Sequence, residues 1–419
     1  MKKHAIWAII ALAALYSAPR LDAQSFELRG SLRGWLKAFT LSPNELDLLE
    51  SRLKLELVSR LGKKTAFRSI LYYTYDGVTK DDAWDLKEAY FDYYGDLVDI
   101  RLGKQIIAWG KADELNPTDV LNAQDMTNIT EDKIIRKRGV TALKMDWKLS
   151  DFVLTLVWKP EFESMRLPEY GSRWAFFSIP GISQLPAPSP PEGKLENTEW
   201  AAKLSHTVSL FDFSVSYFDG WDHIFTPELA FDPINQRMDL KRLGFHRTRM
   251  LGFDFAGSVS SVGVWGEGAY FMTEDHGGND PLIKNPYLQF VLGADYTFGS
   301  NVKVNVQYFQ EIRTKIDGEA EDEAERKIIS KLGLGLPVEQ ALSCRIEKKF
   351  GPGEAHKAEV FALYDLKNRG LLLQPKLSIS PEDAVNLEVG YILYAGDDSS
   401  LFGRFDRNDT AYVKATFSF

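Results

Sequence analysis

The sequence predicts an all-β fold: an antiparallel transmembrane β-barrel of about eighteen strands, with sixteen as the alternative count. Three observations support this class. Apolar and polar residues alternate at period two almost from end to end, short polar turns alternate with long loops, and the chain ends on an aromatic residue. Single-chain bacterial barrels have an even number of strands, short periplasmic turns and longer extracellular loops.

Residues 1–23 are predicted to be a cleaved signal peptide. Lys2 and Lys3 precede an apolar run over 5–15, and small and polar residues follow it up to Ala23. This order is typical of a secretory signal, and the run is shorter than the roughly 20 residues that a helix needs to cross a bilayer. Residues 24–419 are therefore expected to form a single barrel domain in the outer membrane of a Gram-negative bacterium.

The first alternating strand predicted with a defined orientation is 52–57. Arg52 and Lys54 should face the lumen together with Glu56, while the three intervening leucines should face lipid. A register slip of one residue would exchange the two faces. It would place two basic groups in hydrocarbon, at a cost of about 4–8 kcal/mol near the bilayer midplane.

The lengths of the turns and loops distinguish a barrel from a soluble β-sandwich, whose strands also alternate apolar and polar residues. Short turns are predicted at 62–64, 94–96, 149–151, 207–209, 257–258, 299–300, 351–353 and 380–383. Long loops are predicted at 76–83, 109–137, 160–195, 220–243, 272–285, 313–337 and 396–408, with 326–337 counted as loop. Because turns and loops alternate without exception, all turns fall at one end of the strands, as in an outer-membrane barrel.

The C-terminal strand carries a second signal. Phe419 and Phe417 share one face of the last strand, and this ending is expected to be recognised by the outer-membrane assembly machinery. The strand should pair with the first one, near 26–37, because an open edge would leave unpaired amides in lipid.

The strand over 98–108 has a polar face that is predicted to line the lumen. Arg101 and Gln105 lie on this face, and Glu88 and Asp92 point inward from the preceding strand. An ion pair from Arg101 to either carboxylate is geometrically reasonable. Such charges either brace the wall or select the solute by charge and size, and the sequence leaves both interpretations open.

The loop 109–137 is predicted to fold into the barrel. It carries apolar side chains, such as Trp109 and Leu121, that would form an exposed apolar patch on an extended loop. Asp113 and Asp119 are expected near basic lumen residues such as Arg138. The full set of candidate lumen and constriction residues is Arg101, Gln105, Glu88, Asp92, Trp109, Asn116, Asp119, Arg138, Arg52 and Lys54.

Catalytic and metal-binding patterns are not found. No two histidines have metal-ligand spacing, and the glycines 263, 266 and 268 lie in a predicted strand, where they relieve crowding. The single Cys344 cannot form an internal disulfide, and the net charge of −9 argues against nucleic acid as a partner. No enzyme activity and no cofactor are expected.

Two parts of the chain resemble a known family. Residues 101–105, Trp109-Gly110 and 116–122, with 362–365, 372–375 and 401–403 near the C-terminus, are similar to a family of proteobacterial outer-membrane barrels of undefined function. The alginate-export-type porins look like relatives. The resemblance implies a porin-like channel or an exporter component, without naming a substrate.

The expected function is therefore a channel that passes small or oligomeric solutes through a polar lumen narrowed by in-folded loops. The alternative is a non-conducting barrel that serves as a surface-binding or scaffold protein. Expected partners are outer-membrane lipids and lipopolysaccharide, the assembly machinery and the solute.

Overall fold

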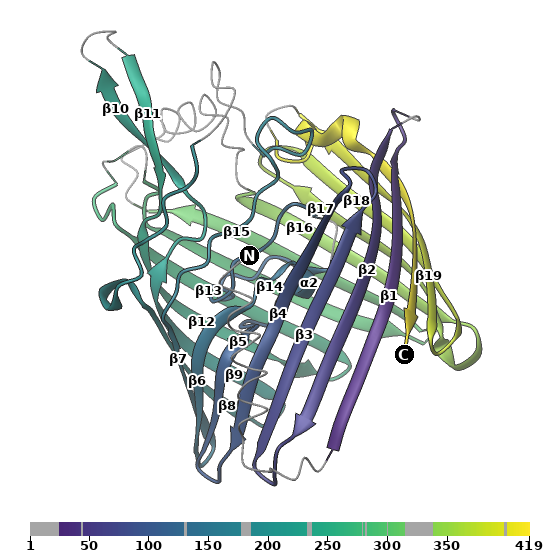
Figure 1. The fold of residues 1–419 in the computed structure, drawn as a ribbon, viewed down its shortest axis with the longest axis horizontal. Helices are drawn as coiled ribbons and strands as arrows, with labels where there is room; N and C mark the ends of the chain where they lie inside the picture. Colours follow the sequence, from purple (N-terminus) through teal and green to yellow (C-terminus); the bar gives the residue numbers. More distant parts are fainter. Residues whose placement is uncertain are drawn as a thin grey trace.

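The computed structural model describes residues 25–42, 45–129, 132–176, 186–232, 237–278, 280, 283–299, 301–314, 338–397 and 400–419. Eighteen strands form one antiparallel sheet, and its last strand pairs with its first, so the sheet is a closed barrel (Figure 1). The predicted fold and the count of eighteen are confirmed. The predicted signal peptide and the segment 326–337 lie outside the described residues.

Neighbouring strands pair in sequence order around the barrel, except that β12 follows β9. The strands of the barrel are β1 (Ser25–Phe39), β2 (Leu46–Arg60), β3 (Thr65–Asp76), β4 (Asp81–Tyr94), β5 (Val98–Gln105), β6 (Val140–Leu149), β7 (Phe152–Lys159), β8 (Glu199–Val208), β9 (Phe211–Trp221), β12 (Arg247–Val259), β13 (Val262–Thr273), β14 (Tyr287–Phe298), β15 (Val302–Arg313), β16 (Gln340–Phe350), β17 (His356–Asp365), β18 (Gly370–Glu382), β19 (Val385–Gly396) and β20 (Thr410–Ser418).

Short helical segments and one separate hairpin occupy the connections. The helical segments are α2 (Lys133–Arg136), η1 (Leu195–Asn197), η2 (Pro352–Glu354) and η3 (Gly403–Asn408). The strands β10 (Thr226–Asp232) and β11 (Arg237–Gly244) form a hairpin inside the predicted loop 220–243, above the barrel rim (Figure 1). None of the helices in the described residues is long and apolar enough to cross a membrane.

Three predicted connections need correction. The predicted turn at 257–258 is wrong, because β12 continues to Val259 and the turn lies at Ser260, which has a φ of 56°. Gly257 is a strand residue instead: a Cβ there would meet the Phe211 ring at 2.4 Å. The turn predicted at 380–383 lies two residues later, after a register shift that removes Pro381 from the ladder. The loop predicted at 76–83 has only four residues in the structure, because β3 ends at Asp76 and β4 begins at Asp81.

The two faces of β2 are distinguished by their neighbours on β1. Arg52 lies opposite Arg33, which is 9% exposed, and Leu53 lies opposite Leu32, which is 53% exposed. Paired residues in a sheet point to the same side. The structure therefore places Arg52 and Lys54 on the inner face of the barrel and the leucines of β2 on its outer face.

The barrel closes at the junction of β1 and β20. The backbone of Phe419 exchanges two hydrogen bonds with Gly30, at 2.8 and 2.9 Å. The Phe419 ring covers Gly30 so closely that a Cβ there would lie 2.3 Å from the ring. Glycine at this position thus allows the terminal aromatic ring to cover the closing strand pair.

Deleting Phe419 should lower the amount of assembled barrel in the outer membrane several-fold, because two closing hydrogen bonds and the covering ring are lost. The measurement is the heat-modifiable folded fraction in isolated outer membranes. Phe419→Tyr, which keeps the ring, serves as the control and should assemble normally. Wild-type levels of the truncated chain would contradict the prediction.

Candidate channel lumen

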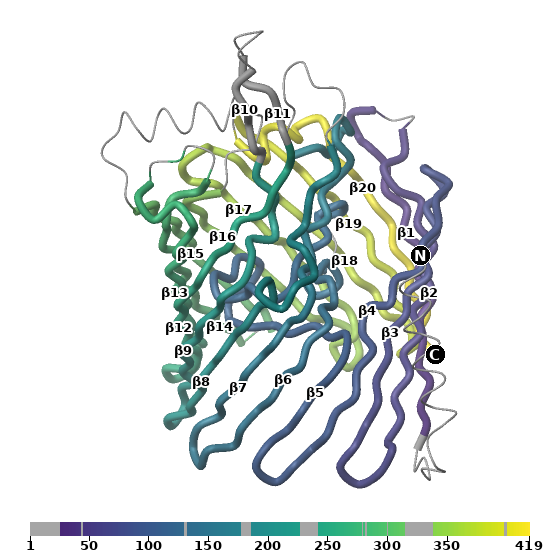
Figure 2. Tube along the Cα trace, turned by 60° about the vertical axis from the view of Figure 1, so that its left-hand side comes forward, coloured from purple at the N-terminus to yellow at the C-terminus, as the bar shows by residue number. Residues whose placement is uncertain are grey.

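The connection between β5 and β6, residues 106–139, crosses the interior of the barrel, and we name it the inner strap. It begins on β5 and contacts β13, β15 and β16. The strand β16 is diametrically opposite β5, because eight strands separate the two in either direction. Figures 1 and 2 show this segment, with α2, inside the ring of strands.

Glu267 on β13 holds the first turn of the inner strap. Its carboxylate, 3% exposed, accepts hydrogen bonds from the amides of Lys111, Ala112 (2.5 Å) and Thr118 (3.3 Å), from the Thr118 hydroxyl (2.9 Å) and from Asn116 Nδ2 (3.3 Å). Gly110 makes the approach possible, since it has a φ of 85° and a Cβ there would meet the carboxylate at 2.5 Å. The carboxylate therefore replaces the missing backbone partners of the turn.

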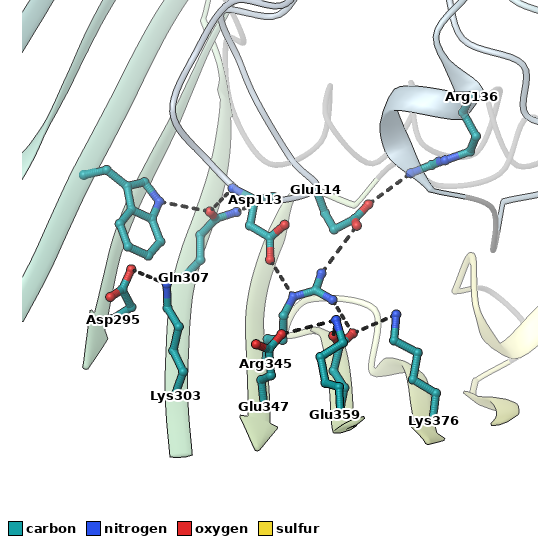
Figure 3. A network of polar contacts seen from close by, with 12 residues as sticks. Asp113, Glu114, Arg136, Asp295, Lys303, Gln307, Arg345, Glu347, Glu359 and Lys376 are labelled. Atoms are coloured by element: carbon teal, nitrogen blue, oxygen red, sulfur yellow. Dashed lines mark hydrogen bonds and ion pairs between the residues drawn. The ribbon is translucent and has the colours of Figure 1, made fainter. Parts of the chain in front are cut away.

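Two further wall residues hold the tip of the inner strap (Figure 3). Gln307 on β15 accepts from the Asp113 amide at 2.9 Å and donates to the Asp113 carbonyl at 2.7 Å. Arg345 on β16 pairs with the Asp113 carboxylate at 2.9 Å, with Glu114 at 3.5 Å and with Glu359 of β17 at 2.6 Å. The tip is thus hydrogen-bonded to the wall through both its backbone and its side chains.

The returning half of the inner strap is held by internal contacts. Asp119 forms a buried ion pair with Lys137, and Asn122 accepts from the Ile107 amide at 2.7 Å. Lys133, at the start of α2, donates to Asn116. Burial lowers the pKa of Lys133, while the nearby Asp119 carboxylate acts in the opposite direction. These contacts give the segment a defined structure of its own.

A second segment that the sequence did not predict also crosses the barrel mouth. We name residues 160–176, which follow β7, the outer strap. Arg173 stacks on Phe39 of β1 at 3.9 Å and donates to Asn408 of η3 at 2.7 Å. Trp174 donates to Asp47 of β2 at 2.6 Å. The outer strap therefore reaches the wall on the side where the barrel closes.

The predicted candidates on β4 and β5 lie close together. Arg101 forms an ion pair with Asp92 at 2.7 Å and stacks on Tyr90 at 4.0 Å. Glu88 instead accepts from the Ile106 amide at 2.9 Å, where the inner strap begins. Gln105 is fully buried and donates to the Ala142 carbonyl at 2.9 Å.

The other candidates are distributed over the wall and the inner strap. Arg52 pairs with Glu50 at 2.7 Å and Lys54 with Glu56 at 2.9 Å. Trp109 is 6% exposed and packs in an apolar cluster, and Asn116 contacts Glu267. These residues belong to one continuous interior surface formed by the wall and the inner strap.

Asp113 and Asp119 lie beside basic groups, as expected, but Arg138 is not one of them. Arg138 pairs with Glu163 of the outer strap at 2.9 Å and donates to the Ser164 carbonyl at 2.6 Å. Asp119 forms its ion pair with Lys137, and Asp113 forms its ion pair with Arg345 on the opposite wall. Asp119 therefore pairs within the inner strap, Asp113 pairs with a distant strand, and Arg138 joins the two straps.

In most lumen ion pairs between wall residues the basic group is the more accessible member, whereas at the strap tip Asp113 is more exposed (32%) than Arg345 (23%). The Lys54 side chain is 31% exposed and its partner Glu56 11%, and Arg101 is 30% exposed against 10% for Asp92. Lys357 and Glu359 differ more, at 34% and 3%. The long basic side chains extend from the wall while the carboxylates lie against it.

A cavity of about 420 Å³ lies beside the tip of the inner strap. Its lining residues are Lys111, Ala112, Asp113, Trp265, Asp295, Lys303, Asn305, Arg345 and Glu347. Most of them carry a charge or an amide. The space next to the strap tip is therefore polar and bounded by both the strap and the wall.

Comparisons with known proteins agree with this architecture. A family model described as a protein of unknown function, DUF1302, matches residues 65–313. No curated protein matches the chain.

Similar solved structures include Acinetobacter baumannii OccAB2, at 10% identity and a TM-score of 0.53, covering 96% of this chain and 99% of that one. Pseudomonas aeruginosa OccK11 (OpdR) is similar at 11% identity and a TM-score of 0.52, covering 95% and 96%. A triple mutant of the Rhodopseudomonas blastica porin has 14% identity and a TM-score of 0.43, covering 94% and 100%. The chain thus shares its barrel fold with OccAB2 and OccK11.

Proposed function

Because the chain belongs to the DUF1302 family, whose function is unknown, we propose from its structure that it is an outer-membrane channel for small or oligomeric solutes. The inner strap is its constriction. The observation that carries the proposal is the course of the strap from β5 to the opposite strand β16. A segment in this position lies in the path of any solute that moves through the barrel.

The way the strap is fastened also supports a constriction. Its contacts with the far wall are hydrogen bonds and ion pairs from Glu267, Gln307 and Arg345. Such contacts can be exchanged with water or with a polar solute. The accessible basic side chains around them would act on a permeating ion at close range.

The decisive experiment is single-channel recording of the refolded protein in a planar bilayer at several salt concentrations. A variant in which residues 111–118 are replaced by a short Gly-Ser linker provides the comparison. We expect a small conductance for the wild type and a several-fold larger one for the variant. Equal conductances of the wild type and the linker variant would show that the strap does not lie in the conduction path.

One observation favours the second candidate, a non-conducting barrel with a binding or scaffold role. Two straps, not one, reach across the barrel: the inner strap contacts β16, opposite β5, and the outer strap crosses the mouth to β2 and η3. The same recordings decide between the candidates. A wild type that stays silent while the linker variant conducts would identify a barrel that its own loops seal.

Replacing Arg101 by alanine should reduce the preference of the channel for anions. The change removes an accessible charge and leaves Asp92 without its 2.7 Å partner. One unit charge about 8 Å from a permeating ion in water changes its energy by roughly 0.5 kcal/mol, or about twofold in the permeability ratio. The reversal potential in a salt gradient measures this ratio.

Arg29→Ala is the matched control for this variant. Arg29 also pairs with a carboxylate, Glu27, but lies at the exposed end of β1 and is 61% exposed. Its removal should leave the reversal potential unchanged. If Arg101→Ala lost folded protein yet kept wild-type selectivity in the remaining fraction, Arg101 would be a structural brace.

A further inference from the structure

Apolar side chains line the lumen at the level of the two straps, and we name this set the apolar girdle. Its larger members include Phe218, Met250, Phe309, Leu363 and Leu372, all at most 7% exposed. Each points inward, since, for example, Phe309 shares its face with Gln307, and Leu363 shares its face with Glu359. Transmembrane barrels usually have a polar interior, so this lining is a departure that needs a reason.

The straps cover the girdle with apolar side chains of their own. Trp109 and Leu121 of the inner strap pack on the side of β6 to β14. Leu115 of the inner strap and Trp174 and Phe176 of the outer strap pack on the side of β14 to β20. The girdle is therefore dry while the straps are in place.

Movement of the straps would uncover the girdle. The straps are fastened to the wall by the polar contacts of Glu267, Gln307 and Arg173 and by the packing of their apolar side chains on the girdle. A fully polar solute that displaced the straps would leave the apolar girdle in contact with water, which is unfavourable. A solute with an apolar body would cover the same surface and replace the strap side chains there.

We propose, building on the proposed channel function, that the solute is an anionic amphiphile: a molecule with an apolar body and a carboxylate or similar anionic head. The body packs on the apolar girdle in place of the strap side chains. The head meets the basic side chains beyond it, such as Lys54, Arg101 and Lys357.

The choice of an anionic head follows from which charges are accessible. In most lumen pairs between wall residues the basic members extend from the wall, and their carboxylates, such as Glu56 and Glu359, lie behind them. The greater exposure of basic side chains in the lumen does not reflect the composition, because the chain as a whole has a net charge of −9. An interior of this kind favours anions over cations at the level below the girdle.

The test compares two carboxylates that differ only in their apolar part. Sodium decanoate and sodium butyrate are added to the protein in a planar bilayer, and block of the ionic current is measured. Decanoate should block at a concentration at least about 50-fold lower, as burial of roughly three extra methylenes would give. Decyltrimethylammonium, with a similar chain and a cationic head, should not block.

Two girdle variants report whether the effect arises in the lumen. Leu372→Gln and Met250→Gln, on β18 and β12, should each remove most of the preference for decanoate and keep the block by butyrate. Leu372→Met, which keeps the position apolar, should behave like the wild type. A decanoate block that both Gln variants retain would come from the lipid and would overturn the proposal.

A binding measurement separates this proposal from the channel itself. Decanoate is titrated into the protein in lipid nanodiscs, and tryptophan fluorescence is followed in the wild type and in Trp109→Phe and Trp174→Phe. A silent barrel whose strap tryptophans respond to decanoate, but not in Leu372→Gln, would end the channel proposal and keep the amphiphile site. A conducting barrel that decanoate and butyrate block at the same concentration would end the amphiphile proposal and keep the channel proposal.

Discussion

Replacing Glu267 by alanine is expected to release the inner strap and to increase the single-channel conductance several-fold. The carboxylate is the common acceptor for the turn at 110–118, with the Thr118 hydroxyl at 2.9 Å among its donors. Hydrogen bonds to a charged group contribute about 1.5–3 kcal/mol each. Loss of only two of them, about 3–6 kcal/mol, would shift the equilibrium between a fastened and a free strap by more than about 100-fold.

The variant Glu267→Gln gives a graded comparison. It keeps the shape of the side chain but has one acceptor oxygen instead of two, so its conductance should lie between wild type and alanine. Glu354→Ala, in the exposed turn before β17, is the control for general effects of removing a carboxylate. A normally assembled Glu267→Ala protein with wild-type conductance would show that other contacts hold the strap.

Replacing Lys159 by methionine is expected to destabilise the barrel by about 3–5 kcal/mol, the usual cost of removing one partner from a buried ion pair. Lys159 and Glu199 face each other across β7 and β8 at 2.7 Å, and both side chains are at most 1% exposed. The remaining carboxylate would have no countercharge. The measurement is the urea midpoint of unfolding in lipid vesicles.

The double variant Lys159→Met with Glu199→Gln separates the ion pair from the packing. It contains no buried charge at this position and should recover most of the lost stability. Lys64→Met, which removes an exposed pair with Asp96, should change the midpoint little, because exposed pairs contribute about 0–1 kcal/mol. If the double variant were as unstable as the single one, the loss of stability would come from the changed side-chain packing and not from the unpaired charge.

The strand pattern was predictable because the residues of each strand show which face is turned to lipid. Over 52–57, the apolar side chains face lipid and the charged ones face the polar interior, so neighbouring residues alternate in polarity. The inward course of the inner strap was also predictable in outline, since Trp109 and Leu121 needed an apolar environment. Their burial in one cluster agrees with that reasoning.

The partners of the strap were not predictable by the same means. Glu267 lies in a glycine-rich strand and contacts residues about 150 positions earlier in the chain, a separation over which periodicity carries no information. Asp113 and Asp119 were expected near basic lumen residues such as Arg138. The structure gives that role to Lys137, the adjacent residue, and directs Arg138 toward Glu163.

The outer strap was overlooked for a related reason. The proline-rich stretch 186–191 made the whole region look like an extended surface loop, whereas the informative residues are Arg173 and Trp174. The Arg173 guanidinium stacks on the face of an aromatic ring, where a cation is attracted by the ring quadrupole. Its target, Phe39, is on the first strand of the barrel.

The course of the straps also constrains the order in which the protein matures. The inner strap precedes its distant anchors in the chain: it ends at 139, and they are at 267, 307 and 345. The outer strap contacts both earlier residues, Phe39 and Asp47, and a later one, Asn408. A strap cannot be threaded into a cylinder that has already closed without passing back through its mouth. We therefore expect the two segments to settle against the growing sheet while it is still an open trough, before β20 joins β1 and encloses them.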